Sequence, residues 1–214
     1  MRVITLLLSA VVLGPPLAAP VPSAARKCDP RGTELALDTE RSVIRWRGTK
    51  FWGLGKHEGT VRFKAGAFCV VDGVVRGAYF EADMGTIDVT DIPADDPEPR
   101  RRLRDHLRSE DFFAVSQHPL ARFILRTVKE EKPRLYTVSG DLTIRGRTHP
   151  VTFYARGWTV TEGQVRAEGR LTIDRHQYGV SYRGSTIKDD LVDDEFFLDL
   201  AIEARPRAAV SAGR

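Results

Sequence analysis

Five histidines are the side chains of this 214-residue chain best suited to bind a metal or to move a proton near neutral pH. They are His57, His106, His118, His149 and His176. No two of them are three or four residues apart, the spacing that presents two imidazoles on one face of a helix. The sequence therefore predicts no metal or haem site, and we expect each histidine to be exposed or to make a local hydrogen bond.

Other charged motifs do not indicate catalysis either. Asp174 and Arg175 end an apolar segment, where such a pair usually makes hydrogen bonds that shape a turn, and Gly179 nearby favours the same interpretation. An acidic cluster further on lacks the ligand spacing and central glycine of an EF-hand, so it does not predict a calcium site. Its members are Asp189, Asp190, Asp193, Asp194 and Glu195. Because the chain also has no G-x-S-x-G motif, we predict neither an enzyme nor a bound cofactor.

The amino-acid composition limits the class of protein to which this chain can belong. The chain is 42% hydrophobic and 29% charged, which suits one globular domain with a buried core and excludes a disordered or collagen-like chain. Its two cysteines are too few for a disulfide-stapled miniprotein. The formal net charge of +4 is too small to indicate a nucleic-acid partner.

The N-terminal residues 1–25 have the three parts of a secretory signal peptide. Arg2 precedes the apolar run Val3–Leu17, and small residues and prolines follow as far as Ala25. A membrane anchor is the alternative, but it needs about 20 uninterrupted apolar residues, and this run is shorter and contains Gly14. We therefore predict cleavage of residues 1–25, export to the periplasm or the medium, and no transmembrane segment in the mature chain. The mature chain divides into a domain at 26–204 and a tail at 205–214.

The two cysteines bear on export. Cys28 follows Ala25, Arg26 and Lys27, which do not form the small apolar box of a lipoprotein, so we predict no lipid anchor. In an oxidising compartment Cys28 and Cys69 can pair. Two buried, unpaired thiols are the alternative, and the sequence leaves both open.

Eight segments of the mature chain place apolar residues at every second position, the pattern of strands with one apolar and one wet face. They are 43–47, 61–64, 80–84, 121–126, 138–145, 151–155, 165–173 and 196–203. One-sided strands favour an antiparallel sheet, and closing that sheet into a barrel removes its exposed edges. Gly140 and Gly169 fall on the inward side, where they suit either sharp strand curvature or a space left for something other than a side chain.

One stretch interrupts the strands. Prolines end the preceding segment, and Leu103 and Leu107 stand one turn apart, which predicts a short helix near residues 99–109 lying across one end of the barrel as a lid. The run Arg100–Arg102 indicates a solvated face, or alternatively a contact with lipid headgroups or another anionic partner.

Four motifs in chain order resemble those of one family. Asp105–Phe113 resembles the element HLxSxDFF, Gly140–Val151 resembles GDLTIxGxTxPV, and Asp174–Val180 resembles DRxxYGV. The final segment Asp194–Ala204 is similar to the closing strand of the same family, the YceI-like proteins. The resemblance spans roughly residues 35–204.

The resemblance implies an eight-stranded antiparallel lipocalin-like barrel, exported and not known for catalysis, whose tunnel binds a polyisoprenoid or a fatty-acid derivative. The inward apolar positions give the candidate tunnel lining: Ile44, Trp46, Phe63, Phe80, Met84, Phe123, Leu142, Phe153, Leu171 and Leu198. Each of these residues taken singly also suits an ordinary core, and only the set indicates a tunnel. By the same resemblance, His57 and His106 are candidates to close the tunnel mouth or to hold a ligand headgroup.

A second hypothesis belongs to a different class. The barrel interior is then filled by side chains, and the protein is a stress-related interaction module that binds no lipid. Its contacts are then the basic helical segment and the acidic loop on its surface.

Overall fold

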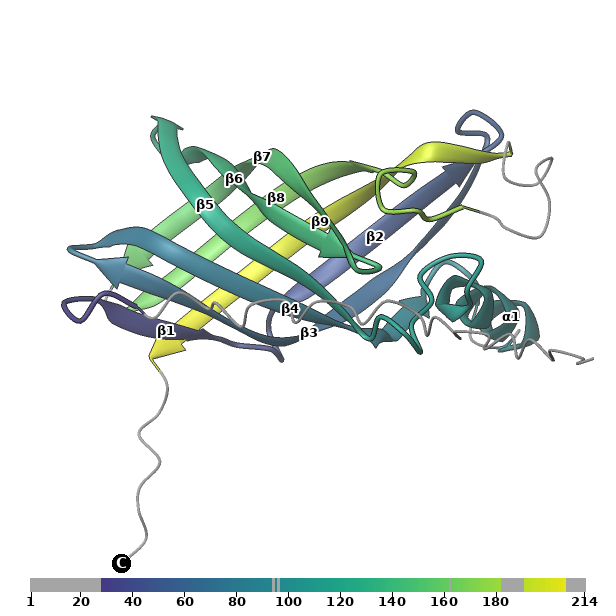
Figure 1. Ribbon diagram of the computed structural model, residues 1–214, viewed down its shortest axis with the longest axis horizontal. Helices are drawn as coiled ribbons and strands as arrows, with labels where there is room; N and C mark the ends of the chain where they lie inside the picture. Colours follow the sequence, from purple (N-terminus) through teal and green to yellow (C-terminus); the bar gives the residue numbers. More distant parts are fainter. Residues whose placement is uncertain (1–27, 94, 96, 162, 182–190, 207–214) are drawn as a thin grey trace, which may run out of the picture.

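Alternating apolar and polar residues build a β-barrel with one helix beside one of its ends in this computed structural model (Figure 1). The structure describes residues 28–93, 95, 97–161, 163–181 and 191–206. The predicted signal peptide lies outside the described residues. In chain order the elements are β1 (Thr33–Leu37), β2 (Val43–Lys50), β3 (Gly55–Val71), β4 (Val74–Val89), α1 (Pro97–Arg108), β5 (Leu120–Lys132), β6 (Leu135–Ile144), β7 (Arg147–Thr161), β8 (Gln164–Asp174) and β9 (Val192–Pro206).

The sheet closes on itself. Neighbouring strands follow the order β1-β3-β2-β9-β8-β7-β6-β5-β4, and further pairings of β3 with β4 and of β1 with β9 close the ring. All of these pairings are antiparallel. Closure leaves no long unpaired strand edge among the described residues. Removal of exposed edges is the reason why an antiparallel sheet of this kind was expected to close into a barrel. The predicted antiparallel barrel is confirmed.

The strands β1 and β2 share one position in the wall. Both lie between β3 and β9: β2 pairs with the first part of β3, and β1 pairs with the last part of β3 and with the end of β9. Nine strands therefore fill eight positions among the described residues. Where β1 gives way to β2, the Asp38 amide and the Ser42 hydroxyl both donate to the carbonyl oxygen of Glu203, at 2.8 and 3.2 Å. These bonds keep the wall continuous across the break.

Seven of the eight predicted segments lie within strands, and the eighth, 138–145, runs one residue past the end of β6 at Ile144. The strand β1 was not predicted. The strand β9 runs through Pro206, whose partner is Leu35, so the folded domain extends two residues past the expected boundary at 204. The helix spans Pro97–Arg108, where 99–109 was expected.

The helix α1 is attached to β4. Leu107 is buried in the same apolar cluster as the β4 residues, and Leu103 packs against that cluster. The Arg100 guanidinium lies 2.5 Å from the Asp88 carboxylate, and Arg108 donates to the carbonyl oxygens of β4, including that of Ile87 at 3.2 Å. Figure 1 shows the helix beside the end of β4.

Cys28 and Cys69 form a disulfide, which decides between the two alternatives left open by the sequence. Their Cα atoms are 5.2 Å apart, and the bridge joins the start of the described chain to β3. Because it closes a loop of 41 positions, the bridge restricts the unfolded chain and stabilises the fold by about 3–4 kcal/mol.

Candidate functional site

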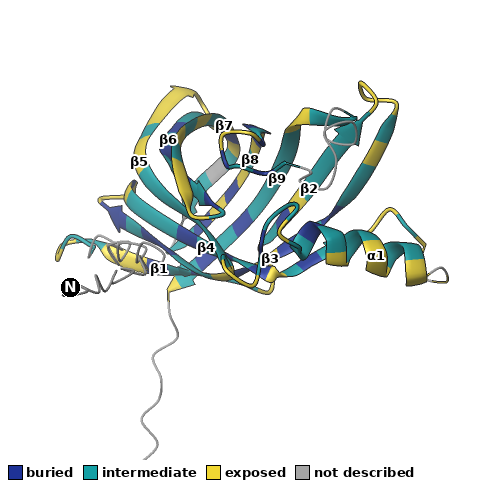
Figure 2. Cartoon of the chain, turned by 45° about the vertical axis from the view of Figure 1, so that its right-hand side comes forward, coloured by how far each residue is buried: buried dark blue, intermediate teal, exposed yellow. Residues whose placement is uncertain are grey.

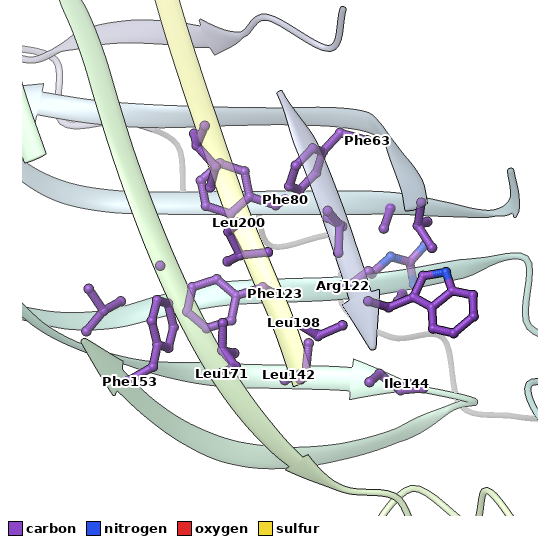
Figure 3. A pocket seen from close by; sticks show the side chains of 18 of the residues that line it. Phe63, Phe80, Arg122, Phe123, Leu142, Ile144, Phe153, Leu171, Leu198 and Leu200 are labelled. Carbon is purple, nitrogen blue, oxygen red and sulfur yellow. The ribbon is translucent and has the colours of Figure 1, made fainter. Parts of the chain in front are cut away.

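An apolar cavity of about 140 Å³ lies inside the barrel. The inward-facing residues of β2 to β9 line it, because alternate side chains on each strand point into the barrel (Figure 3). All ten predicted lining residues stand on this wall: Ile44, Trp46, Phe63, Phe80, Met84, Phe123, Leu142, Phe153, Leu171 and Leu198. Their contact with a ligand remains a prediction.

Aromatic rings follow one another along the wall. The Phe80 ring lies at the centre of the row, with ring centroids 6.0 Å from Phe63, 5.1 Å from Phe68 and 6.3 Å from Phe123. Phe123 continues the row to Phe153 at 5.9 Å. Most of these contacts are edge-to-face, the arrangement that aromatic pairs favour over a face-to-face sandwich. The rings give the cavity a continuous apolar surface.

Phe68 lines the cavity, although strict alternation along β3 does not predict that it points inward. It stands an odd number of positions after Phe63, so in a regular strand the two side chains would face opposite sides. The pairing of β3 with β4 shifts register between Phe63 and Ala65, a bulge-like irregularity. An extra residue at such a place reverses the alternation that follows, and both rings reach the cavity.

Trp46 is held by a glycine and a backbone carbonyl. A Cβ on Gly59 would lie 2.6 Å from the Cζ2 atom of Trp46, so the indole occupies space that only glycine leaves free. The indole Nε1 donates to the Asp88 carbonyl oxygen at 3.1 Å. The polar group of the ring is satisfied within the protein, and its apolar part faces the cavity.

The inward glycine Gly169 serves the same purpose on β8. A Cβ there would lie 2.9 Å from Cε2 of Phe153, and Gly169 itself lines the cavity. The space that the missing side chain leaves at Gly169 is filled by the ring of Phe153, so it is not a space left for something other than a side chain.

Two charged residues belong to the lining, but neither places an unpaired charge inside the barrel. Arg122 lies 2.8 Å from the Glu81 carboxylate through its Nε atom, and Glu168 is exposed. Apart from these two, the side chains of the lining are apolar, and Gly169 has none. Such a wall provides burial energy for an apolar guest.

A family model described as the YceI-like domain matches residues 35–204. The chain belongs to the YceI-like family. The matched range is the one over which the chain resembles the family, and it covers the barrel except for the first two residues of β1 and the last two of β9.

Solved structures share the fold of this YceI-like chain. One is the crystal structure of Burkholderia cenocepacia BcnA, with a TM-score of 0.65, 20% identity, and coverage of 78% of this chain and 99% of that one. Another is a polyisoprenoid binding domain from Saccharophagus degradans implicated in plant cell wall breakdown. Its TM-score is 0.57 at 14% identity, with 81% of this chain and 98% of that one covered.

Curated relatives match over shorter stretches. A "UPF0312 protein" of Photorhabdus laumondii is 46% identical over 95 residues, covering 44% of this chain and 43% of the relative. One from Shewanella denitrificans is 33% identical over 103 residues, covering 48% of this chain and 52% of the relative. The matches therefore span about half the length of these relatives.

The two histidines proposed for the mouth of this YceI-like barrel are not among the residues that line the cavity. His57 Nδ1 lies 2.9 Å from the Asp91 carboxylate. His106 Nε2 lies 3.2 Å from Asp111, and its ring packs against Phe112. A role at a headgroup remains a prediction, and it would have to act from outside the cavity wall.

The helix does not form the expected lid over the cavity. No residue of α1 lines the cavity, because the helix packs on β4, and Phe113 from the following segment reaches inside. Arg145 fixes this segment: it donates to the carbonyl oxygens of Glu110 at 2.9 Å, Phe112 at 2.8 Å and Gly179 at 2.5 Å. One guanidinium thus joins the segment after the helix to the turn after β8.

Arg175 of the family motif shapes that turn, as the sequence indicates. Its guanidinium is buried and donates to the carbonyl oxygens of Val180, Val192 and Asp193 at 3.1–3.2 Å. It also lies 3.6 Å from the Asp194 carboxylate. Because each of these bonds goes to the protein's own backbone or to a neighbouring side chain, Arg175 is a structural residue of the YceI-like fold.

Tyr178 of the same motif is buried, with 1% of its surface exposed. Among the residues that the structure describes, its hydroxyl has no hydrogen-bond partner, and its ring packs against His149 with centroids 5.2 Å apart. Burial raises the pKa of Tyr178 to about 12, since the phenolate is poorly solvated there.

The acidic cluster is only partly described, because Asp189 and Asp190 lie outside the described residues. Asp193 accepts a hydrogen bond from the Trp52 amide at 3.0 Å, and Asp194 lies 2.8 Å from His176 Nε2. Within the described ranges, no group of three or more His, Cys, Asp or Glu side chains is arranged to hold a metal. Within these ranges too, no helix has the length and apolar character needed to cross a bilayer.

Proposed function

We propose that this YceI-like protein is an exported binding or carrier protein for an amphiphile with a long apolar tail, such as a polyisoprenoid or a fatty-acid derivative, held inside the barrel. The apolar cavity and its ten predicted lining residues carry the proposal. The shared fold with a structure described as a polyisoprenoid binding domain supports the choice of ligand. The proposal includes no catalytic step.

The energetics suit such a ligand. Each buried methylene contributes about 0.8 kcal/mol, so ten of them contribute roughly 8 kcal/mol before the cost of ordering the chain. A cavity of about 140 Å³ resembles one that accepts a benzene ring and is smaller than typical ligand pockets of about 300–1,000 Å³. A long chain therefore requires the rings of residues such as Phe80 and Phe123 to turn aside.

Export rests on residues 1–25 and on the cysteines. A disulfide between Cys28 and Cys69 suits an oxidising compartment, which is where a cleaved signal peptide would deliver the chain. We propose the periplasm or the medium as the location and an unlipidated N-terminus. Intact mass measurement of the protein from fractionated producing cells tests this, and a chain that keeps residues 1–25 in the cytoplasm contradicts it.

Binding is tested by native mass spectrometry and by solvent extraction of the purified protein. Retained or added polyprenyl or acyl chains are expected to raise the mass of the folded barrel. Ala121→Leu, which adds volume to the cavity wall, is expected to reduce uptake, whereas Thr152→Leu on the outer face is the matched control. A protein that never takes up such chains contradicts the proposal.

The cavity volume also favours a second candidate function. A space of about 140 Å³ is consistent with a mostly filled barrel that acts through its surface as an interaction module. Trp46 discriminates the two, because its indole faces the cavity. Titration with a fatty acid or an isoprenoid alcohol changes tryptophan emission if the cavity is the binding site, and Trp46→Phe is expected to remove most of that change. An unchanged spectrum supports the filled barrel.

A further inference from the structure

The turn between β2 and β3 exposes three large apolar side chains, which we call the aromatic tip (residues Phe51–Leu54). Trp52 is 86% exposed, Leu54 is 89% exposed and Phe51 is 39% exposed (Figure 2). The other large apolar side chains exposed in the described part of the chain, Val74 and Tyr154, stand singly. Adjacent exposed apolar side chains contribute nothing to the core and indicate a contact surface.

The backbone of the aromatic tip is held in a costly conformation. Phe51, Trp52 and Gly53 have φ angles of 55°, 56° and 84°, in the left-handed region that bulky residues rarely adopt. Bonds from β9 and the residue before it fix this turn: the Phe51 amide donates to the Leu191 carbonyl oxygen at 2.9 Å, and the Trp52 amide donates to Asp193 at 3.0 Å. The turn is therefore a defined structure that presents its side chains outward.

Two lysines flank the tip, and the Asp193 carboxylate lies at the tip on the Trp52 amide. Lys50 lies over the Phe51 ring at 5.7 Å, while Lys56 on the other side pairs with Glu58 at 2.9 Å. The connection containing α1 leaves the barrel at the same end, because β4 runs antiparallel to β3 and ends at Val89 opposite Gly59; in Figure 1 the helix lies below the β2–β3 turn. The helix has five arginines against two acidic residues; Arg101 and Arg102 are exposed, and Arg101 pairs with Glu98 at 2.8 Å and with Asp105 at 3.7 Å. Exposed aromatic and aliphatic side chains near a basic helix are the composition of an interfacial membrane contact.

We propose that the aromatic tip inserts into the headgroup region of an anionic lipid membrane, with the exposed arginines of α1 contacting the headgroups. The choice of a membrane as partner rests on the proposed function, because a ligand with a long apolar tail resides in membranes. Trp46, which lines the cavity, is four residues before Lys50, the last residue of β2, about 14 Å at 3.4 Å per residue. Docking therefore brings this end of the cavity to the lipid surface.

The experiment uses vesicles of phosphatidylcholine mixed with phosphatidylglycerol, and vesicles of phosphatidylcholine alone. The double variant Trp52→Ser/Leu54→Ser is expected to partition at least about tenfold less onto the mixed vesicles. Tyr154→Ser removes an exposed ring from the outer wall and is the matched control, expected to bind as the parent does. Brominated acyl chains in the mixed vesicles are expected to quench the emission of Trp52, and this quenching should be absent from Trp52→Ser. Residues 1–25 contain no tryptophan, so they cannot produce this signal even if they contribute to binding.

Three outcomes overturn the inference: equal partitioning of the double variant and the parent, equal loss in Tyr154→Ser, or Trp52 emission that bromine leaves unchanged. Equal binding to both kinds of vesicle overturns the part assigned to the α1 arginines. The lipid content of the purified double variant is expected to match that of the parent, because the tip does not line the cavity. A protein that docks on vesicles through the tip but never takes a lipid into its cavity would contradict the proposed function. The same result would support membrane docking.

Discussion

The ring of Phe123 on β5 lies against Gly140 on β6, in space that a side chain at position 140 would need. A Cβ there would lie 2.5 Å from Cε2 of Phe123 and 2.5 Å from the Ile124 carbonyl oxygen. The missing side chain lets Phe123 take its place in the row of rings between Phe80 and Phe153. A glycine within the family motif on β6 thus determines how an aromatic ring of the cavity wall is seated.

Gly140→Ala is expected to lower the free energy of unfolding by about 1–3 kcal/mol, because the new methyl group meets a backbone oxygen that no rotamer change can move. Urea denaturation measures the loss. The control is Gly48→Ala, where nothing lies within 4 Å of the added Cβ and where stability should stay the same or rise slightly. Equal effects of the two substitutions would show that Phe123 is not seated on Gly140.

Breaking the disulfide is expected to destabilise the barrel without changing its fold. The double variant Cys28→Ser/Cys69→Ser frees a loop of 41 positions, which lowers the free energy of unfolding by about 3–4 kcal/mol. Denaturation in the presence and absence of a reductant checks this. Reductant should shift the midpoint of the parent and leave that of the double variant unchanged.

Arg145→Ala is expected to lower stability by about 2–3 kcal/mol, since it leaves the carbonyl oxygens of Glu110, Phe112 and Gly179 without this donor. Hydrogen exchange should become faster in the segment after α1 and in the turn after β8. Arg126→Ala removes an exposed ion pair with Asp141 and should cost no more than about 1 kcal/mol. If exchange rises equally across the whole barrel, Arg145 does not join these two segments specifically.

The hydroxyl of Tyr178 gives a pH-dependent prediction. Its pKa is raised to about 12 in the folded state by burial, against an ordinary value of 10, so the neutral phenol stabilises the fold fully below pH 10. That contribution, about 2–3 kcal/mol, is lost as the pH rises from about 10 to about 12.

Tyr178→Phe removes this titration and an unpartnered buried hydroxyl, so it should be as stable as the parent or more stable near neutral pH. Above pH 10 its advantage over the parent should grow. Denaturation midpoints across this range measure the difference, with the exposed Tyr154→Phe as the control. A constant difference between the parent and Tyr178→Phe would mean that the phenol ionises as readily in the folded as in the unfolded chain.

The barrel was predictable because its strands are long and one-sided. The alternating pattern identified one strand at each of the eight positions in the barrel wall. At the position that β1 and β2 share, the pattern identified β2 and missed β1. The strand β1 has five residues, of which only Leu35 and Leu37 are buried, too few to make a recognisable period. Its place between β3 and β9 depends on pairings with residues far away in the chain.

The helix and the histidines show where local patterns stop being informative. The spacing of Leu103 and Leu107 correctly indicated a helix, but where the helix packs depends on its bonds to β4, such as that between Arg100 and Asp88. In the same way, the family resemblance selected His106, whereas Asp111 and Phe112 surround its ring in the folded chain.

Sequence alone determined which face of most strands is apolar, and with it ten of the residues of the cavity wall, because side chains of a regular strand alternate at a period of two. Tertiary structure decided the rest. The bulge in β3 brought Phe68 inside, the closure of the sheet set the cavity at about 140 Å³, and the folded chain brought Cys28 to Cys69. These features depend on register and on contacts between distant segments, and no local pattern in the chain specifies those.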